Sequence, residues 1–66
     1  MENLRRLREA AGLTQTQLAE RVGVKQCSLS AWEVGITKPS TVNLLKLAYV
    51  LECSVDELIG RKPAGA

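Results

Sequence analysis

The chain has 66 residues, of which 45% are hydrophobic and only Trp32 and Tyr49 are aromatic, and its net charge is +2. A chain this short buries only about 60% of its unfolded-state surface, so it holds one small core and has no room for an enclosed substrate pocket. A charge this small permits a nucleic-acid partner but does not demand one.

The first helical pattern covers residues 2–12. One face, with the spacing i, i+3, i+4, i+7, comprises Leu4, Leu7, Arg8 and Ala11. An arginine within a mainly apolar stripe needs a partner, because burying an unpaired charge is costly. Gly12 follows the last periodic residue and suits the left-handed position that ends many helices.

The second and third helices meet at Gly23 with almost no loop between them. Thr14 and Gln17 form a T-x-x-Q capping box that begins the second helix, and the third begins at about Lys25 and ends at Gly35. Gly23 supplies the positive φ of a sharp turn without a Cβ penalty. The inward residues of this unit are Leu18, Ala19, Val22, Val24, Leu29 and Trp32. The result is a rigid two-helix wedge whose second helix projects outward and can enter a DNA major groove.

The fourth helix follows a connector in which Pro39 precedes a cap at Ser40 or Thr41. Its apolar residues form two adjacent stripes. One stripe is Leu44, Leu47, Ala48 and Leu51, and the other is Val42, Leu45 and Tyr49. One core needs only one stripe, so the second requires another explanation.

The fifth helix begins at a Ser54-x-x-Glu57 capping box and ends at Gly60. Residues 61–66 are predicted to be a disordered tail after a single domain of residues 1–60. Since no segment shows a strand pattern, the predicted fold is all-α, a compact bundle of five short helices.

The sequence also argues against several classes of site. Two cysteines and no histidine cannot supply the four ligands of a zinc site, so we expect no metal and no cofactor, and free thiols at Cys27 and Cys53. No apolar run approaches transmembrane length, so we expect a soluble cytoplasmic protein without a membrane partner. Without histidine or a pair of carboxylates in a cleft, we expect no enzyme.

The pattern GLTQTQLAERVGV…S…WEVG…PS…LLKLAYVL…SVDELIG resembles the phage repressor/Cro type of helix-turn-helix DNA-binding domain over about residues 4–60. The match includes the turn pattern and the flanking helices in order, which makes it specific. The resemblance implies that helices 2 and 3 form the helix-turn-helix, and that the chain is a sequence-specific double-stranded DNA-binding transcriptional regulator, most often a repressor in this family. Lys25, Cys27, Ala31, Ile36 and Glu52 depart from residue types common in the family.

The resemblance also implies a partner for Arg8. In this family an arginine in helix 1 pairs with a glutamate at the end of helix 3, and the matching positions are Arg8 and Glu33. The pair would lock helix 3 against helix 1. The alternative is two solvated surface charges, and the apolar neighbours of Arg8 argue against it.

The side of the third helix opposite Leu29 and Trp32 carries Gln26, Cys27, Ser30 and Ala31, the positions that match the family's base-reading residues. The Gln26 amide can contact adenine N6 and N7 together, and Ser30 can donate or accept. Cys27 and Ala31 are small enough to pack on a thymine methyl group.

Phosphate contacts are expected from residues around this face. Gln15 lies at the N-terminus of the second helix, where free amides attract anions, and matches a phosphate-contacting glutamine in the family. In the connector, Thr37, Lys38 and Ser40 form the expected clamp on the other side. Lys25 fits either base reading or phosphate contact.

A homodimer on a palindromic operator is expected, because one reading helix covers only a few base pairs. The predicted dimer surface comprises Val42, Leu45, Tyr49, Val55 and Ile59. Alternatively, the first helix or the tail covers this stripe within one chain. The same stripe leaves open a different function, that of a protein-interaction module such as an antitoxin-like or accessory domain.

Overall fold

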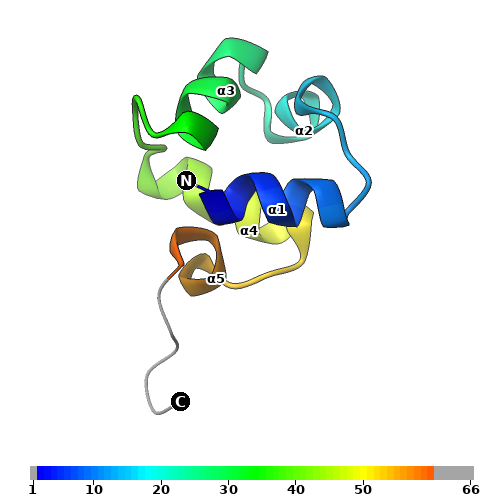
Figure 1. Ribbon diagram of the computed structural model, residues 1–66, viewed down its shortest axis with the longest axis vertical. Coiled ribbons are helices and arrows are strands. Elements are labelled where there is room, and N and C mark those ends of the chain that lie inside the picture. The colour runs from blue at the N-terminus through cyan, green and yellow to red at the C-terminus, as the bar shows by residue number, and fades with distance from the viewer. Residues whose placement is uncertain (1, 61–66) are drawn as a thin grey trace.

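The computed structural model describes residues 2–60, and all the regular secondary structure within that range is helical. Its five helices are α1 (Glu2–Ala10), α2 (Gln15–Val22), α3 (Gln26–Val34), α4 (Thr41–Leu51) and α5 (Val55–Ile59). Figure 1 shows α2 and α3 at one end of the bundle and α5 at the other, with α1 lying across in front of α4. The all-α prediction is confirmed, whereas the predicted tail at 61–66 lies outside the described residues.

Two capping boxes begin α2 and α5, as predicted. The Thr14 hydroxyl accepts from the Gln17 amide at 3.1 Å, and the Gln17 side chain accepts from the Thr14 amide at 2.9 Å. The Ser54 hydroxyl accepts from the Glu57 amide at 3.1 Å, and the Glu57 carboxylate accepts from the Ser54 amide at 3.5 Å. These local bonds satisfy amides that have no partner within the helix.

The starts of α3 and α4 differ in their caps. Lys25 takes the N-cap position of α3 and makes no side-chain capping bond there. Ser40 caps α4 by accepting from the Asn43 amide at 3.3 Å. Because Lys25 offers no side-chain cap, α3 lacks the capping hydrogen bond that the other helix starts at Thr14, Ser40 and Ser54 have. The helix nevertheless begins at Gln26, within one residue of the predicted start.

The turn between α2 and α3 is closed by Gly23, whose φ is 84°. The amides of Gly23 and Val24 both donate to the Ala19 carbonyl, at 2.8 and 3.0 Å. At the end of α4 the same left-handed conformation is taken by Glu52, with φ 54°, the one non-glycine residue of positive φ among residues 2–60. Glu52 thus occupies a position at which glycine carries no Cβ penalty.

The core lies where the five helices meet, and each contributes at least one side chain to it. The buried hydrophobic residues are Leu4, Leu18, Ala19, Val22, Leu29, Trp32, Leu47 and Leu58. Ala11, predicted to lie on the buried face of α1, is exposed. That prediction is wrong because α1 ends at Ala10, and Ala11 belongs to the turn, where helical periodicity no longer applies.

Candidate nucleic-acid interface

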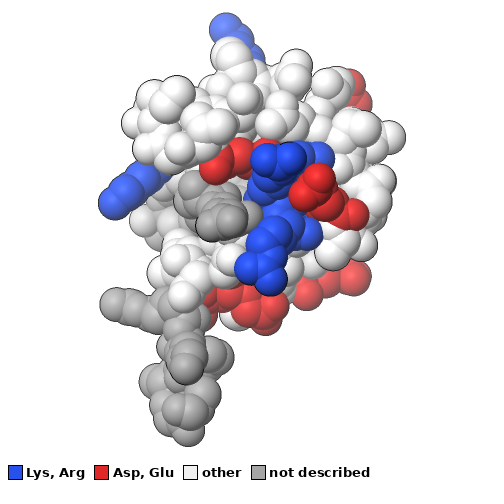
Figure 2. All heavy atoms as spheres, viewed as in Figure 1, with Lys and Arg blue, Asp and Glu red and all other residues white. Residues whose placement is uncertain are grey.

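The outer side of α3 presents the side chains that the sequence predicted there. Gln26 and Cys27 are exposed, and Ser30 and Ala31 are partly exposed, while Leu29 on the opposite side is buried. The one charged residue of α3, Glu33, is only 8% exposed. Figure 2 shows basic side chains gathered over α1 and a mainly uncharged surface over α3. This face is therefore suited to reading the hydrogen-bond pattern and shape of base edges rather than to binding phosphate groups.

Gln26 is held in place by a second glutamine. Its Nε2 donates to Gln15 Oε1 at 3.2 Å, and Gln15 Nε2 donates to Glu33 Oε1 at 3.0 Å. An amide nitrogen carries two hydrogens, so Gln26 retains one donor and its oxygen acceptor for a base edge. Sequence reasoning placed these two glutamines in separate roles and missed the bond. Each is the first residue of its helix, and the bond between them depends on the angle at which α3 crosses α2.

Arg8 and Glu33 form a nearly buried ion pair between α1 and α3. Arg8 Nε lies 2.6 Å from Glu33 Oε2, and Nη2 donates to Glu33 Oε1 at 3.2 Å. Nη1 donates to the Leu13 carbonyl at 2.8 Å. The hydrogen bond with Glu33 raises the pKa of the Arg8 guanidinium, although burial acts in the opposite direction. This network fixes the end of α3 and the approach to α2 on the same helix, α1.

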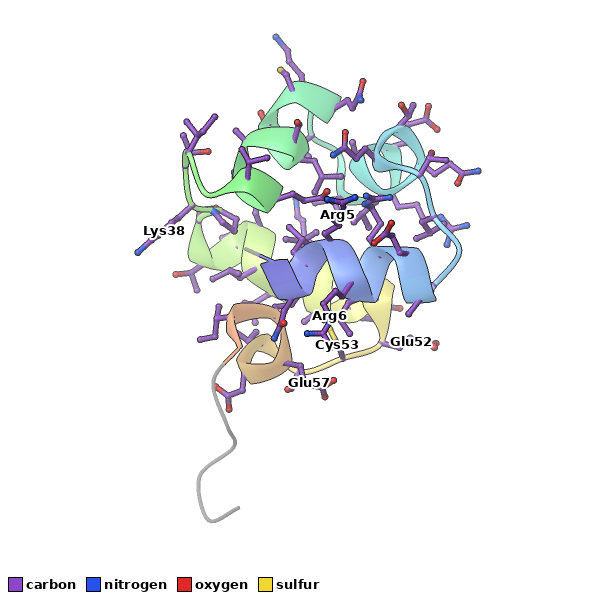
Figure 3. The ribbon with its side chains drawn as sticks, viewed as in Figure 1. Arg5, Arg6, Lys38, Glu52, Cys53 and Glu57 are labelled. Atoms are coloured by element: carbon purple, nitrogen blue, oxygen red, sulfur yellow. The ribbon has the colours of Figure 1, made fainter. Side chains whose placement is uncertain are left out.

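The candidate phosphate contacts flank α3 at both of its ends. Lys25 precedes α3 and is exposed, and exposed Thr37, Lys38 and Ser40 follow it in the connector. Figure 3 shows the Lys38 side chain pointing away from the body of the protein. Gln15 is partly buried because its side chain lies between Gln26 and Glu33. An uncharged face with cations beyond its ends is the arrangement expected of a helix inserted between two phosphate backbones.

The second apolar stripe of α4 is exposed. Val42, Leu45 and Tyr49 are 60%, 58% and 85% exposed, and Ile59 is 46% exposed, whereas Val55 is partly buried. The alternative that helix 1 covers this stripe is wrong, because α1 packs against α3 and α5 instead. The alternative that the tail covers it concerns residues outside the described range.

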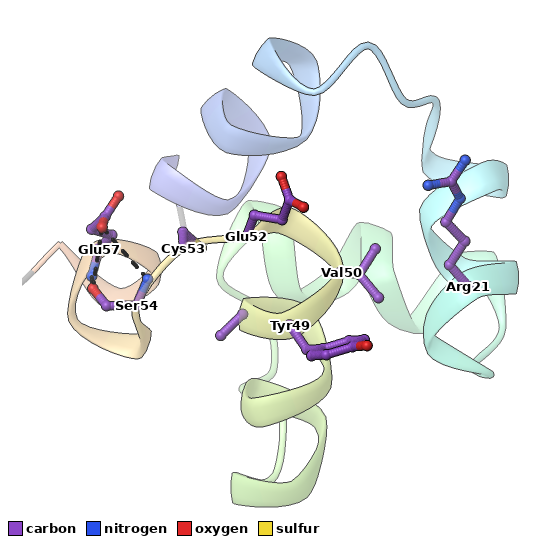
Figure 4. A pocket seen from close by; sticks show the side chains of 8 residues that line it. Arg21, Tyr49, Val50, Glu52, Cys53, Ser54 and Glu57 are labelled. Atoms are coloured by element: carbon purple, nitrogen blue, oxygen red, sulfur yellow. Dashed lines mark hydrogen bonds between the residues drawn. The ribbon is translucent and has the colours of Figure 1, made fainter.

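A groove beside this stripe is lined by residues of α2, α4, the turn after α4 and α5. Figure 4 shows Arg21 of α2 facing it from one side, and Tyr49 and Val50 of α4 from the other. Glu52 and Cys53 line the same groove. Burial, with a smaller contribution from the nearby Glu57 carboxylate, raises the pKa of the Cys53 thiol.

Residues 2–60 contain neither a cluster of metal-ligating side chains nor a membrane-spanning helix. No group of three or more His, Cys, Asp or Glu residues between 2 and 60 is arranged to hold a metal ion. None of the helices in that range has the length and apolar character needed to cross a membrane.

Comparison with known proteins identifies a consistent set of relatives. Residues 4–58 match the sequence family described as Helix-turn-helix. The cryptic phage CTXphi transcriptional repressor RstR of Vibrio cholerae serotype O1 is 42% identical over 60 residues, which are 91% of this chain and 54% of RstR. Repressor protein C2 of Salmonella phage P22 is 38% identical over 58 residues, 88% of this chain and 27% of C2. The chain spans about half the length of the first curated relatives it matches.

Solved structures of a repressor and a controller protein have folds similar to that of this chain. The P22 c2 repressor in complex with a synthetic operator has a TM-score of 0.82 and 38% identity, with 86% of each chain covered. The restriction-modification controller protein C.AhdI from Aeromonas hydrophila has a TM-score of 0.81 and 40% identity, again with 86% of each chain covered.

Proposed function

The chain belongs to the helix-turn-helix family, and from that premise we propose that it is a sequence-specific double-stranded DNA-binding transcriptional regulator that acts as a repressor. In this proposal it reads the major groove with α3, acts on DNA in the cytoplasm and has no catalytic role of its own. RstR and P22 C2 are named as repressors, which supports repression rather than activation of transcription.

The observation that carries the proposal is the outer face of α3. Four uncharged side chains are at least partly exposed there, while the helix's one charge is turned inward; the four are Gln26, Cys27, Ser30 and Ala31. A major groove admits a helix of this kind and presents a distinct donor and acceptor pattern for each base pair. The complex of the similar P22 c2 repressor with operator DNA supports this use of the fold.

We assign Gln26 the main role in base recognition and Gln15 the role of supporting it while contacting phosphate. The bond between the two amides restricts the rotamers of Gln26 before DNA binds, which lowers the entropy lost on binding. Lys25, Thr37, Lys38 and Ser40 are assigned to the phosphates on either side.

We further propose that the chain binds as a two-fold symmetric dimer through the exposed face of α4. This face comprises Val42, Leu45 and Tyr49, with Val55 and Ile59 of α5 beside it. A C2 interface uses the same patch on both copies, so it must be self-complementary. Arg21 and Glu52, which carry opposite charges, both line the groove that Tyr49 also lines.

Sedimentation velocity across micromolar concentrations tests the dimer. Tyr49→Asp places a charge in the proposed interface and is expected to give monomers at every concentration. Thr16→Asp is the matched control, because it adds the same charge at an exposed position in the first turn of α2. A wild-type monomer at all concentrations, with no pairing on a palindromic duplex, would refute the dimer. A dimer undisturbed by Tyr49→Asp would refute the surface.

Selection of bound duplexes from a random DNA library, followed by sequencing, tests the function itself. We expect one enriched site. On that site Gln26→Ala should lose about 1–3 kcal/mol and relax one base position. Lys38→Ala should weaken binding to all sequences similarly and reduce the salt dependence by about one unit of slope.

The second candidate function is a protein-interaction module, and the exposed α4 face is the observation that favours it. The selection experiment separates the two functions. If no sequence is enriched and no salt-dependent gel shift is seen with genomic fragments, the DNA-binding proposal fails and the interaction module takes its place.

A further inference from the structure

A chain of hydrogen-bonded side chains links the Arg8–Glu33 pair to the exposed end of Gln26. Glu33 Oε1 accepts from Gln15 Nε2 at 3.0 Å, and Gln15 Oε1 accepts from Gln26 Nε2 at 3.2 Å. Burial decreases along the chain, since the Glu33 side chain is 3% exposed, Gln15 is partly buried and Gln26 is exposed. These four side chains, those of Arg8, Glu33, Gln15 and Gln26, are called the amide relay.

The direction of every bond in the amide relay follows from its buried end. An ionised carboxylate has no hydrogen to donate, whereas a guanidinium can only donate. Glu33 accepts two bonds from Arg8, at 2.6 and 3.2 Å, and can only accept from Gln15 as well. Gln15 must then turn its nitrogen toward Glu33 and its oxygen outward. Gln26 therefore meets an acceptor and has to donate to it.

This direction decides which groups Gln26 displays to a base. With one hydrogen given to Gln15, the Gln26 amide displays one N–H donor and its oxygen acceptor. If the Gln15 amide were reversed, the Gln26 oxygen would face it and two N–H donors would be displayed instead. Adenine presents N7 as acceptor and N6 as donor in the major groove, which matches the first pattern. Guanine presents two acceptors, N7 and O6, which match the second.

We propose that Glu33 is a positioning residue for base recognition, and that its carboxylate, acting through Gln15, makes Gln26 select adenine over guanine. A glutamine amide without such a restraint adopts both orientations, because its terminal torsion is roughly two-fold. Glu33 thus has a second role beside stabilising the contact between α1 and α3. This inference rests on the proposed function, since it names the base that Gln26 reads.

The test compares two duplexes, the site enriched by selection and the same site with the A·T pair replaced by G·C at the position that Gln26→Ala relaxes. The ratio of the two dissociation constants measures discrimination, and the folded fraction cancels because one variant binds both duplexes. The wild type should prefer adenine by roughly five- to 150-fold. Glu33→Gln, whose amide donates as well as accepts, should lower this preference to below about three-fold.

A second variant separates positioning from stability. Arg8→Met with Glu33→Leu replaces the buried pair by apolar side chains, so it should keep a stability close to the wild type and still lose the preference for adenine. Adding Gln15→Glu to this variant places a group that only accepts beside Gln26. The preference should then return, although the added negative charge weakens binding to both duplexes. A purely structural role of Glu33 predicts no such rescue.

The matched control is Glu57→Gln, which makes the same chemical change in α5, at the other end of the bundle from α3 (Figure 1). Glutamine completes a capping box as glutamate does, so this variant should fold and keep the wild-type ratio. A fall in its ratio equal to that of Glu33→Gln would overturn the inference, because loss of any carboxylate would then suffice.

The remaining outcomes distinguish the inference from the proposed function. If Gln26→Ala relaxes a position that is not an A·T pair, or if Arg8→Met with Glu33→Leu keeps the full preference, the inference is overturned while DNA binding stands. Loss of the preference without rescue by Gln15→Glu overturns the relay through Gln15. If the library yields no enriched site, the proposed function itself fails.

Discussion

Removing either partner of the Arg8–Glu33 pair should severely destabilise the domain. The two side chains are 11% and 3% exposed, so removing one takes away the opposite charge of the other at a place that water hardly reaches. Breaking a buried pair in this way costs about 3–5 kcal/mol. A domain of 66 residues has a total stability on the order of 3–10 kcal/mol. Arg8→Ala or Glu33→Ala should therefore remove much of the free energy of unfolding.

The magnitude follows from the bonds that each substitution removes. Arg8→Ala deletes two bonds to Glu33 and the bond to the Leu13 carbonyl, and leaves Glu33 with its bond from Gln15. Glu33→Ala leaves the guanidinium with the Leu13 carbonyl. Because both singles break the same two bonds, the double variant should lose less than the sum, with a coupling of about 0.5–3 kcal/mol.

Urea unfolding at about 15 °C, near the temperature of maximum stability, is the appropriate assay. Fluorescence of Trp32, which is 6% exposed, reports tertiary packing, and circular dichroism reports the helices. Glu33→Gln serves as a milder variant because it removes the charge and keeps an oxygen acceptor. Arg8→Met with Glu33→Leu should be closer to the wild type than either alanine variant. Additive losses in the double-mutant cycle would refute the coupling.

Three further predictions concern backbone strain and thiol reactivity. Gly23→Ala should lower stability by about 1–2 kcal/mol from positive φ alone, since no atom beyond the two adjoining residues lies within 4 Å of the added Cβ. A larger loss in thermal melting would contradict this reasoning. Glu52→Gly should stabilise by about 1 kcal/mol in urea unfolding, because relief of its left-handed conformation outweighs the entropy glycine adds to the unfolded chain. Alkylation by iodoacetamide at pH 8, followed by mass spectrometry, should label exposed Cys27 before Cys53. The raised pKa of Cys53 lowers its thiolate fraction, and its partial burial limits access of the reagent; equal rates would show that α5 opens readily.

The sequence by itself determined the local features of this protein. The capping boxes at Thr14 and Ser54 join groups three residues apart, so the residue types alone specify the helix starts. Gly23 and Gly35 mark turns whose backbone conformation depends on a single residue. Helical periodicity assigned Leu29 and Trp32 inward and therefore assigned the reading face outward.

Relations between distant residues were decided only by the tertiary structure. Arg8 needed a partner on sequence grounds, but Glu33 was implied by family resemblance, and its contact across 25 positions depends on how α1 crosses α3. Whether the α4 stripe stays exposed was left open by the sequence and depends on α1 packing elsewhere. The bond between Gln15 and Gln26 depends likewise on the angle between α2 and α3. Periodicity fixes which side of a helix is apolar, whereas packing against other helices decides what that side meets.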